Sequence, residues 1–236
     1  MDLKDYQLGI CKHDFWFKSR SELIKSLFLK AISKQKKLKI LIIGVGVPDN
    51  EELFFLKKYG DLFLIDNNKQ VFDFINRQTY KEKKISNCQP IPYKDYSFDV
   101  ILCSDVLEHI KHHDIVIKEI YRVLKKEGSF VFTVPANKFL YCGFDKYYNH
   151  RRRYEKKELK QLLQHFSEKN IFYWNTTLFP FICIQRLFIN KTIGGRYKLP
   201  KIINIFLYKM LIFESKLINN NIKLPFGLSM VGYAKK

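Results

Sequence analysis

The chain has 236 residues, of which 47% are hydrophobic and 16% aromatic, so a single domain with a sizeable core is expected over residues 1–236. Its cysteines show no C-x-x-C spacing, which argues against a zinc site or a disulfide framework. The first residues lack the apolar run of a signal peptide, so we expect a cytoplasmic protein with free thiols.

The net charge of +19 has two interpretations. It is either a lysine-rich solvated surface or a sign of an anionic partner, such as nucleic acid, acidic lipid or a phosphorylated substrate. Nucleic acid is the less favoured partner, because no compact module of arginines and aromatic residues is visible. The charge is concentrated near the end, where residues 180–236 hold ten Lys or Arg against one acid, Glu214.

The first segment, residues 1–35, contains an aromatic cluster followed by a helical apolar pattern over 21–32. Ser19 or Ser21 could cap this helix. One interpretation is a helix packed on the edge of a sheet. The other is an N-terminal lid over the glycine turn, with Trp16 or Phe17 covering a ligand.

Strand and helix patterns then alternate along the chain. The expected strands are 38–43, 62–65, 85–88, 97–103, 129–134, 171–178 and 228–234, and the expected helices are 48–58, 70–79, 116–126 and 156–166. The alternation predicts an α/β protein with a parallel, doubly wound sheet.

The first of these strands runs directly into Gly44-Val-Gly46, a turn that lets the backbone approach a ligand closely. A dinucleotide site would have a third glycine, but Asp49 stands there and would repel a pyrophosphate at the helix start. Asp66 ends the second strand, where an acid hydrogen-bonds ribose hydroxyls. This corner therefore suits an adenosine-type ligand that lacks phosphate.

Several motifs in this order resemble those of class I S-adenosylmethionine (SAM)-dependent methyltransferases, of the broad type 11/12 group with ubiquinone/menaquinone-type enzymes. The stretches that carry the resemblance are Gly44–Gly46, Asp66, Gln89–His109, Arg122–Gly128, Asp145–Tyr154 and Leu224–Lys235. The resemblance implies a Rossmann-like, seven-stranded sheet, mostly parallel with an antiparallel last strand. It also implies an enzyme that takes SAM as its cofactor.

The same resemblance implies a set of cofactor-binding residues, namely Gly44, Gly46, Asp66, Asn67, Asn87, Cys88 and Ser104. Ile42 stands where the family usually has an acid in the first strand, and Pro48 replaces the third glycine. Asn87 aligns with the usual acid that reads the adenine amine, and an amide can still accept that hydrogen bond. A catalytically weak SAM-fold protein acting in binding or scaffolding is therefore the alternative.

Acceptor residues are expected beyond the carboxyl ends of the strands. His109 and His150 are the candidate general bases, and the candidate substrate residues are Trp16, Arg20, Asp105, Arg153 and Tyr154. A structural histidine bonded to backbone is the alternative for His109, and a solvated turn is the alternative for the 151–153 arginines. His112 and His113 resemble an exposed helix start, so no metal site is expected.

Residues 180–225 form an apolar and basic helical insert between the last two strands, with apolar stretches at 181–189 and 202–218. It is either a buried helical hairpin or an interfacial element on an anionic membrane, too short to span a bilayer. The favoured function is O- or C-methylation of a small-molecule or lipid- or glycan-linked acceptor. With the interfacial interpretation, the protein is expected to lie peripherally on the inner membrane face. An RNA methyltransferase is a further alternative.

Overall fold

One seven-stranded sheet organises the computed structural model, which describes residues 14–32, 37–47, 50–186 and 199–236. The strand order is β3-β2-β1-β4-β5-β7-β6, and β7 alone runs antiparallel to its neighbours. The strands are β1 Leu38–Ile43, β2 Gly60–Asp66, β3 Glu82–Ile85, β4 Phe98–Ser104, β5 Leu124–Pro135, β6 Glu168–Trp174 and β7 Ser229–Lys235. The prediction of a Rossmann-like, mostly parallel sheet is confirmed.

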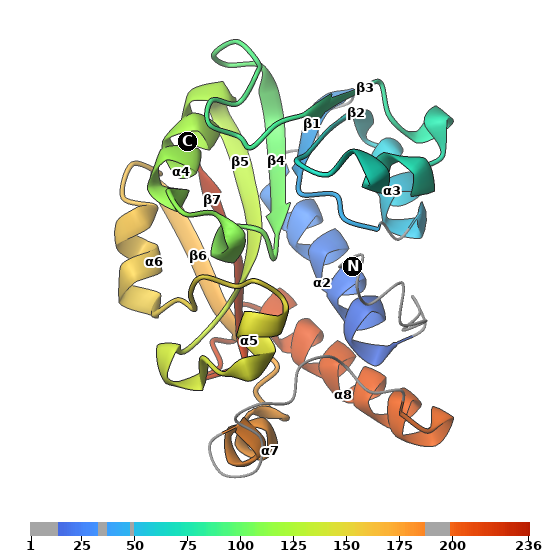
Figure 1. Cartoon of the computed structure of the whole chain (residues 1–236), viewed down its shortest axis with the longest axis vertical. Coiled ribbons are helices and arrows are strands. Elements are labelled where there is room, and N and C mark those ends of the chain that lie inside the picture. Colours follow the sequence, from blue (N-terminus) through green and yellow to red (C-terminus); the bar gives the residue numbers. More distant parts are fainter. Residues whose placement is uncertain (1–13, 33–36, 48–49, 187–198) are drawn as a thin grey trace.

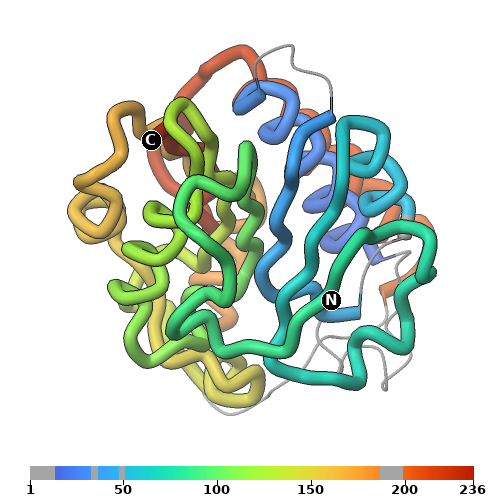
Figure 2. Tube along the Cα trace, turned by 90° about the horizontal axis from the view of Figure 1, so that it is seen from above, coloured from blue at the N-terminus to red at the C-terminus, as the bar shows by residue number. Residues whose placement is uncertain are grey.

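Helices cover both faces of this sheet. Helices α2, α3 and α8 lie along one face, and α4 and α6 lie along the other (Figure 1). Their bounds, with those of two short helices near the carboxyl edge, are α2 Phe15–Ala31, α3 Asn50–Lys57, α4 His113–Val123, α5 Gly143–Tyr147, α6 Lys156–Leu162, α7 Phe179–Ile184 and α8 Lys201–Asn219. Seen from above, the blue to teal segments lie on one side and the green and yellow segments on the other, while the orange of α8 lies beside the blue of α2 (Figure 2).

The central strands are buried on both faces, as their unbroken apolar runs predict. In β1, Leu41 and Ile43 pack toward α4 and α6, whereas Ile40 and Ile42 pack toward α2 and α3. Two hydrophobic cores therefore hold the sheet between helical layers. They fix the carboxyl ends of β1, β2 and β4 at one edge.

Helix α2 begins six residues before the predicted start. Asp14 is its N-cap, because its carboxylate accepts the backbone N–H of Trp16 at 2.9 Å. The prediction of Ser19 or Ser21 as the cap was wrong, since both lie inside the helix and the hydroxyl of Ser19 bonds back to the carbonyl of Phe15. Its later turns bury Leu27 against the sheet. Its first turns therefore lie at the carboxyl edge of the sheet, beside the pocket described below.

The predicted helix over 70–79 was wrong. Two 3₁₀ turns, Lys69–Phe74 and Arg77–Thr79, replace it, and each is capped by an asparagine side chain, Asn68 and Asn76. Capping asparagines compete with a continuous helix. The third strand lies at 82–85 rather than 85–88, because this edge strand alternates exposed and half-buried residues and lacks an apolar run.

The insert at 180–225 contributes α7 and α8, and residues 187–189 of its first apolar stretch lie outside the described residues. Pro48 and Asp49, which follow the glycine turn, also lie outside the described residues. Helix α8 buries Leu211 and Ile218 against the core and exposes a row of large apolar side chains, namely Ile202, Ile203, Ile205, Phe206 and Phe213. Among the helices in the described part of the chain, none has the length and apolar character needed to cross a bilayer.

Candidate functional site

A pocket of about 1220 Å³ lies at the carboxyl ends of β1, β2 and β4. The start of α2, the 142–153 segment and α7 complete its wall. Nearly all of the predicted cofactor and acceptor residues line this pocket, namely Trp16, Arg20, Gly44, Gly46, Asp66, Asn67, Asn87, Cys88, Ser104, Asp105, His109, His150 and Arg153. The structure therefore brings them together, and their roles in binding stay predictions.

The glycine turn after β1 needs glycine at its first position. Gly44 has a φ of +72°, and a Cβ there would lie 2.1 Å from Cγ2 of Val106, which packs on the turn. Gly46 also has a positive φ, of 57°. The absence of side chains lets the backbone form the floor of the pocket and approach a ligand closely.

Asp66 closes this turn from the neighbouring strand. Its carboxylate accepts the backbone N–H of Gly46 at 3.1 Å and that of Asn68 at 2.9 Å. Each oxygen keeps a lone pair, and the side chain lines the pocket although it is largely buried. A pair of ribose hydroxyls fits these remaining acceptors.

Beside β3, the pocket wall is formed by Asn87 and Cys88. The hydroxyl of Ser86 accepts the backbone N–H of Cys88 at 3.0 Å. Burial raises the pKa of the Cys88 thiol to about 12, and the Asp66 charge adds to this effect. The thiol therefore stays neutral and supplies shape rather than a nucleophile.

The next loop is held by an ion pair on α4. Glu119 accepts the N–H of Ile91 at 2.9 Å and two hydrogen bonds from Arg122. Arg122 also donates to the carbonyls of Ile91 and Tyr93. Side chains of α4 thus position the loop that follows Cys88.

Ile42 makes the wall beside the glycine turn apolar. It lies in β1, where the resemblance described above would place an acid, and it is almost wholly buried. The adenosine end of the pocket thus fits SAM, whereas β1 offers no carboxylate to the methionine end.

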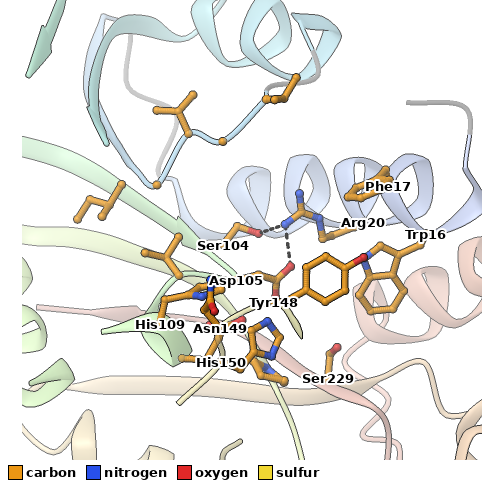
Figure 3. Close-up of a pocket in the computed structure, with 18 of the residues that line it drawn as sticks. Trp16, Phe17, Arg20, Ser104, Asp105, His109, Tyr148, Asn149, His150 and Ser229 are labelled. Carbon is orange, nitrogen blue, oxygen red and sulfur yellow. Dashed lines mark hydrogen bonds and ion pairs between the residues drawn. The ribbon is translucent and has the colours of Figure 1, made fainter. Parts of the chain in front are cut away.

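Arg20 links α2 to the end of β4. Its Nη1 donates to the hydroxyl of Ser104 at 2.9 Å and to Asp105 at 2.7 Å, as the dashed lines in Figure 3 show. Thr133 on β5 donates to the other oxygen of Asp105. Burial alone would raise the pKa of Asp105, but the charge of Arg20 and these hydrogen bonds outweigh it and hold the pKa low. Asp105 is therefore an ionised carboxylate with fixed orientation.

Two histidines meet across the pocket from segments forty residues apart in sequence. The His109 ring ends the 3₁₀ turn Leu107–His109, and its centroid lies 4.8 Å from that of His150, with the rings nearly perpendicular. Both lie near Asn149 and Asp105 in Figure 3. The Nδ1 atom of His150 lies 3.0 Å from the carboxylate of Asp145, which fixes the ring.

Asp145 organises the segment that carries His150. It is fully buried and pairs with Arg153 at 2.9 Å and with Arg186 at 3.3 Å. Burial would raise the pKa of Asp145, but the hydrogen bond with His150 and the arginine charges hold it well below its usual range. Arg153 also donates to the carbonyl of Ala136, so its guanidinium is engaged by the protein itself.

Tyr154 does not belong with the other predicted acceptor residues. It lies in the core, and its hydroxyl forms a 2.9 Å hydrogen bond with Nδ1 of His113 outside the main pocket. Tyr154 forms an isolated β-bridge with Ala136, so the backbone is extended here. Consecutive side chains of an extended chain point in opposite directions, which separates Tyr154 from Arg153. Tyr154 is thus the one predicted acceptor residue that the pocket lacks.

Sequence reasoning missed several pocket residues, above all Glu108. This side chain is fully buried, and neither carboxylate oxygen has a hydrogen-bond partner. Burial raises the pKa of Glu108 well above its usual value, and the Asp105 charge adds to this. Its only sequence signal is its place beside His109. Tyr148, Asn149 and Arg186 were also missed.

Comparisons with known proteins agree with this architecture. Residues 41–132 match the family model described as a methyltransferase domain. An uncharacterized protein of Methanocaldococcus jannaschii is 32% identical over 110 residues, or 46% of each chain. The demethylmenaquinone methyltransferase of Lactobacillus johnsonii is 29% identical over 99 residues, or 38% of this chain and 41% of that protein. The chain thus spans less than half the length of these curated relatives.

The solved structure of a SAM-dependent methyltransferase from Archaeoglobus fulgidus aligns with a TM-score of 0.58 at 15% identity, over 92% of this chain and 94% of that one. Such a likeness concerns the fold, and it extends well beyond the residues that the family model matches. The chain therefore has the fold of SAM-dependent methyltransferases, and its residues 41–132 are similar to a methyltransferase domain.

Proposed function

We propose that this protein transfers a methyl group from SAM to an oxygen of a small-molecule or lipid-linked acceptor. One observation carries the proposal. A single pocket joins the glycine turn and Asp66, which suit an adenosine, to the side where Arg20, Asp105 and His150 gather. A cofactor and an acceptor can therefore lie in contact within it.

The cofactor end would hold SAM through the backbone of Gly44 and Gly46, the carboxylate of Asp66 at the ribose, and the amide of Asn87 at the adenine amine. When bound, SAM supplies a methyl group on a positively charged sulfur. The protein contributes position and exclusion of water, which are its chief levers in a displacement of this kind. Trp16 and Tyr148 line the same pocket and would shield it from solvent.

The acceptor end would orient a hydroxyl and take its proton. Asp145 holds His150 through Nδ1, so Nε2 is the atom that would receive the proton from the acceptor hydroxyl. Arg20 keeps Asp105 ionised and fixed beside it. We infer O-methylation from this pairing, because an acceptor hydroxyl must lose its proton as its oxygen bonds to the methyl carbon, and Nε2 of His150 can take that proton.

An apolar tail on the acceptor is supported by α7. Ile182 and Arg186 line the pocket on this side, while Phe181 and Ile184 are exposed. The exposed apolar row of α8 and the excess of lysine near the end of the chain suit contact with an anionic membrane surface. A lipid-linked acceptor could then reach the pocket from a membrane, with the protein bound peripherally on its cytoplasmic side.

The test uses SAM with a tritiated methyl group and three acceptor pools, namely a lipid extract, an aqueous small-molecule extract and total RNA. The proposal expects label in the lipid or small-molecule pool, with loss of most label in Asp66→Asn. Label in RNA alone would replace the proposal with the RNA alternative. Flotation with anionic vesicles, compared with a variant lacking 181–222, tests the membrane contact separately.

Ile42 favours a second candidate, a SAM-fold protein that binds partners without turnover. Titration calorimetry with SAM separates the two, because a protein with no detectable binding at millimolar SAM is not this enzyme. The variant Ile42→Asp adds the missing carboxylate beside the glycine turn. If weak binding of the methionine amino group limits the wild type, this variant binds SAM about tenfold more tightly, or roughly 1.4 kcal/mol.

A further inference from the structure

Three potential metal ligands converge in the pocket from two segments. Glu108 and His109 belong to the turn after β4, and His150 belongs to the segment after α5. One ligand atom from each lies within 4.8 Å of the others. A carboxylate and two imidazoles form a donor set that divalent transition metals favour over calcium or magnesium.

One carboxyl group of this cluster has no direct partner among the described residues. Asp105 is paired with Arg20, and Asp145 is paired with Arg153 and Arg186. Glu108 has neither a salt bridge nor a hydrogen bond to its oxygens, although it is fully buried. A buried carboxylate without a partner is costly, and a cation beside it would remove that cost.

The surroundings of His150 match those of a metal-binding histidine. Its Nδ1 atom is hydrogen-bonded to the buried Asp145, so Nε2 is the atom that can face a cation. Metal-bound histidines usually hold their second nitrogen in this way, because the partner fixes the ring and makes the ligand more basic. Arg153 and Arg186 in turn fix the carboxylate of Asp145.

We propose that Glu108, His109 and His150 bind one divalent transition-metal cation, with zinc as the best match to two imidazoles and a carboxylate. Ligand atoms around zinc lie about 3.4 Å apart when each is about 2.1 Å from the metal. Small side-chain rotations from the present 4.8 Å would bring these three ligands into that range. All three residues line the pocket, so an acceptor in the pocket could reach a remaining coordination position.

This proposal rests on the proposed function for its chemical role. An acceptor hydroxyl bound at the open position would lose its proton more readily, because the cation lowers its pKa. The proton would leave to solvent or a pocket base, the oxygen would form a bond to the methyl carbon, and the carbon–sulfur bond of SAM would break. The histidines would then hold the cation in place of acting as the base.

The test uses the full chain stripped of metal with a chelator, and then titrated with Zn²⁺ by calorimetry and with Co²⁺ by visible absorption. We expect one cation per chain and a cobalt spectrum with nitrogen and oxygen ligands. Glu108→Gln keeps the size of the side chain and should weaken binding at least tenfold. The His109→Gln and His150→Gln variants should weaken it similarly, with folding checked by circular dichroism.

Two matched controls identify the binding site. His112→Gln removes an exposed histidine near the cluster, and Cys142→Ser removes a thiol that lines the pocket; neither should change the affinity. A wild type that binds no cation, an unchanged affinity in Glu108→Gln, or a loss in either control would overturn the proposal. Calorimetry of SAM with the stripped protein tests the proposed function independently, so the two can fail separately.

Discussion

The two ends of the pocket are built in different ways. The cofactor end consists mainly of backbone, with Gly44 and Gly46 closed by Asp66 across two adjacent strands. The acceptor end consists of side chains from segments far apart in sequence, among them Arg20 and His150. Loss of backbone space should therefore damage the first end, and loss of charge should damage the second.

The difference extends to how each end is held. The strands that place the glycine turn are buried on both faces, so their positions follow from the two hydrophobic cores. At the acceptor end, ion pairs of buried or half-buried groups hold Asp105 and Asp145 in place. Substitutions in each end should consequently separate binding of SAM from processing of the acceptor.

Gly44→Ala should have the largest effect. The positive φ costs a non-glycine residue about 1–2 kcal/mol, and the overlap with Val106 adds about 1–3 kcal/mol. We expect the free energy of unfolding to fall by about 2–5 kcal/mol in denaturant titration and binding of SAM to be lost. Adding Val106→Ala removes the overlapping methyl groups, so it should restore only the part of the free energy of unfolding that the overlap costs. Full recovery in the double variant would show that φ does not matter.

Asp66→Asn should have the next largest effect, on affinity for SAM. Asparagine keeps one acceptor oxygen but loses the charge that receives the N–H groups of Gly46 and Asn68. Loss of about 2 kcal/mol corresponds to a Kd about 30-fold higher in calorimetry. Asp61→Asn is the control, because Asp61 lies at the exposed start of the same strand. An equal loss in the control would contradict the role of Asp66.

Arg20→Gln should affect the acceptor end and leave the cofactor end intact. The substitution leaves Asp105 without its cation, so we expect about 1.5 kcal/mol of destabilisation and roughly tenfold lower kcat/KM for the acceptor. The Kd for SAM should change less than about threefold. Lys25→Gln on the same helix removes only a more exposed ion pair and serves as the control. A large change in SAM affinity would show that the two ends are not separable.

The sequence predicts the cofactor end well, because the relevant signals are local. A strand pattern places Gly44 and Gly46 at its end, and the next strand pattern ends at Asp66. Parallel neighbours then put these ends together. The failures in this half, at 70–79 and 85–88, occur where asparagine caps or an edge strand weaken the apolar periodicity.

The acceptor end depends on tertiary contacts that no local pattern contains. The motifs marked His109 and His150, but the buried pairing of Asp145 with Arg153 became visible only in three dimensions. Tyr154 was assigned to the substrate through its neighbours in sequence, and the backbone turns it into the core. Glu108 was missed because an acid beside a histidine resembles an ordinary solvated helix start.

Glu119→Gln tests the ion pair that holds the loop beside the cofactor end, and its expected effect is the smallest. Arg122 hydrogen bonds hold the pKa of Glu119 below its usual value, against the opposing effect of burial. A lowered folded-state pKa means that this stabilisation is present above about pH 4.3 and is lost as the pH falls through the lowered value. We expect the variant to be about 1 kcal/mol less stable than the wild type at pH 7.

The difference between the two proteins should shrink toward zero as the pH falls below the lowered pKa of Glu119, as measured by urea titration at several acidic pH values. Asp95→Asn is the matched control, because Asp95 pairs with the same arginine but its side chain is 59% exposed. Its effect should stay below about 0.5 kcal/mol at pH 7. A difference for Glu119→Gln that persists unchanged into acid would mean that packing, rather than the charge on Glu119, holds the loop after Cys88. This loop would then resemble the rest of the cofactor end, which is held by backbone and packing, and differ from the acceptor end, which is held by charged side chains.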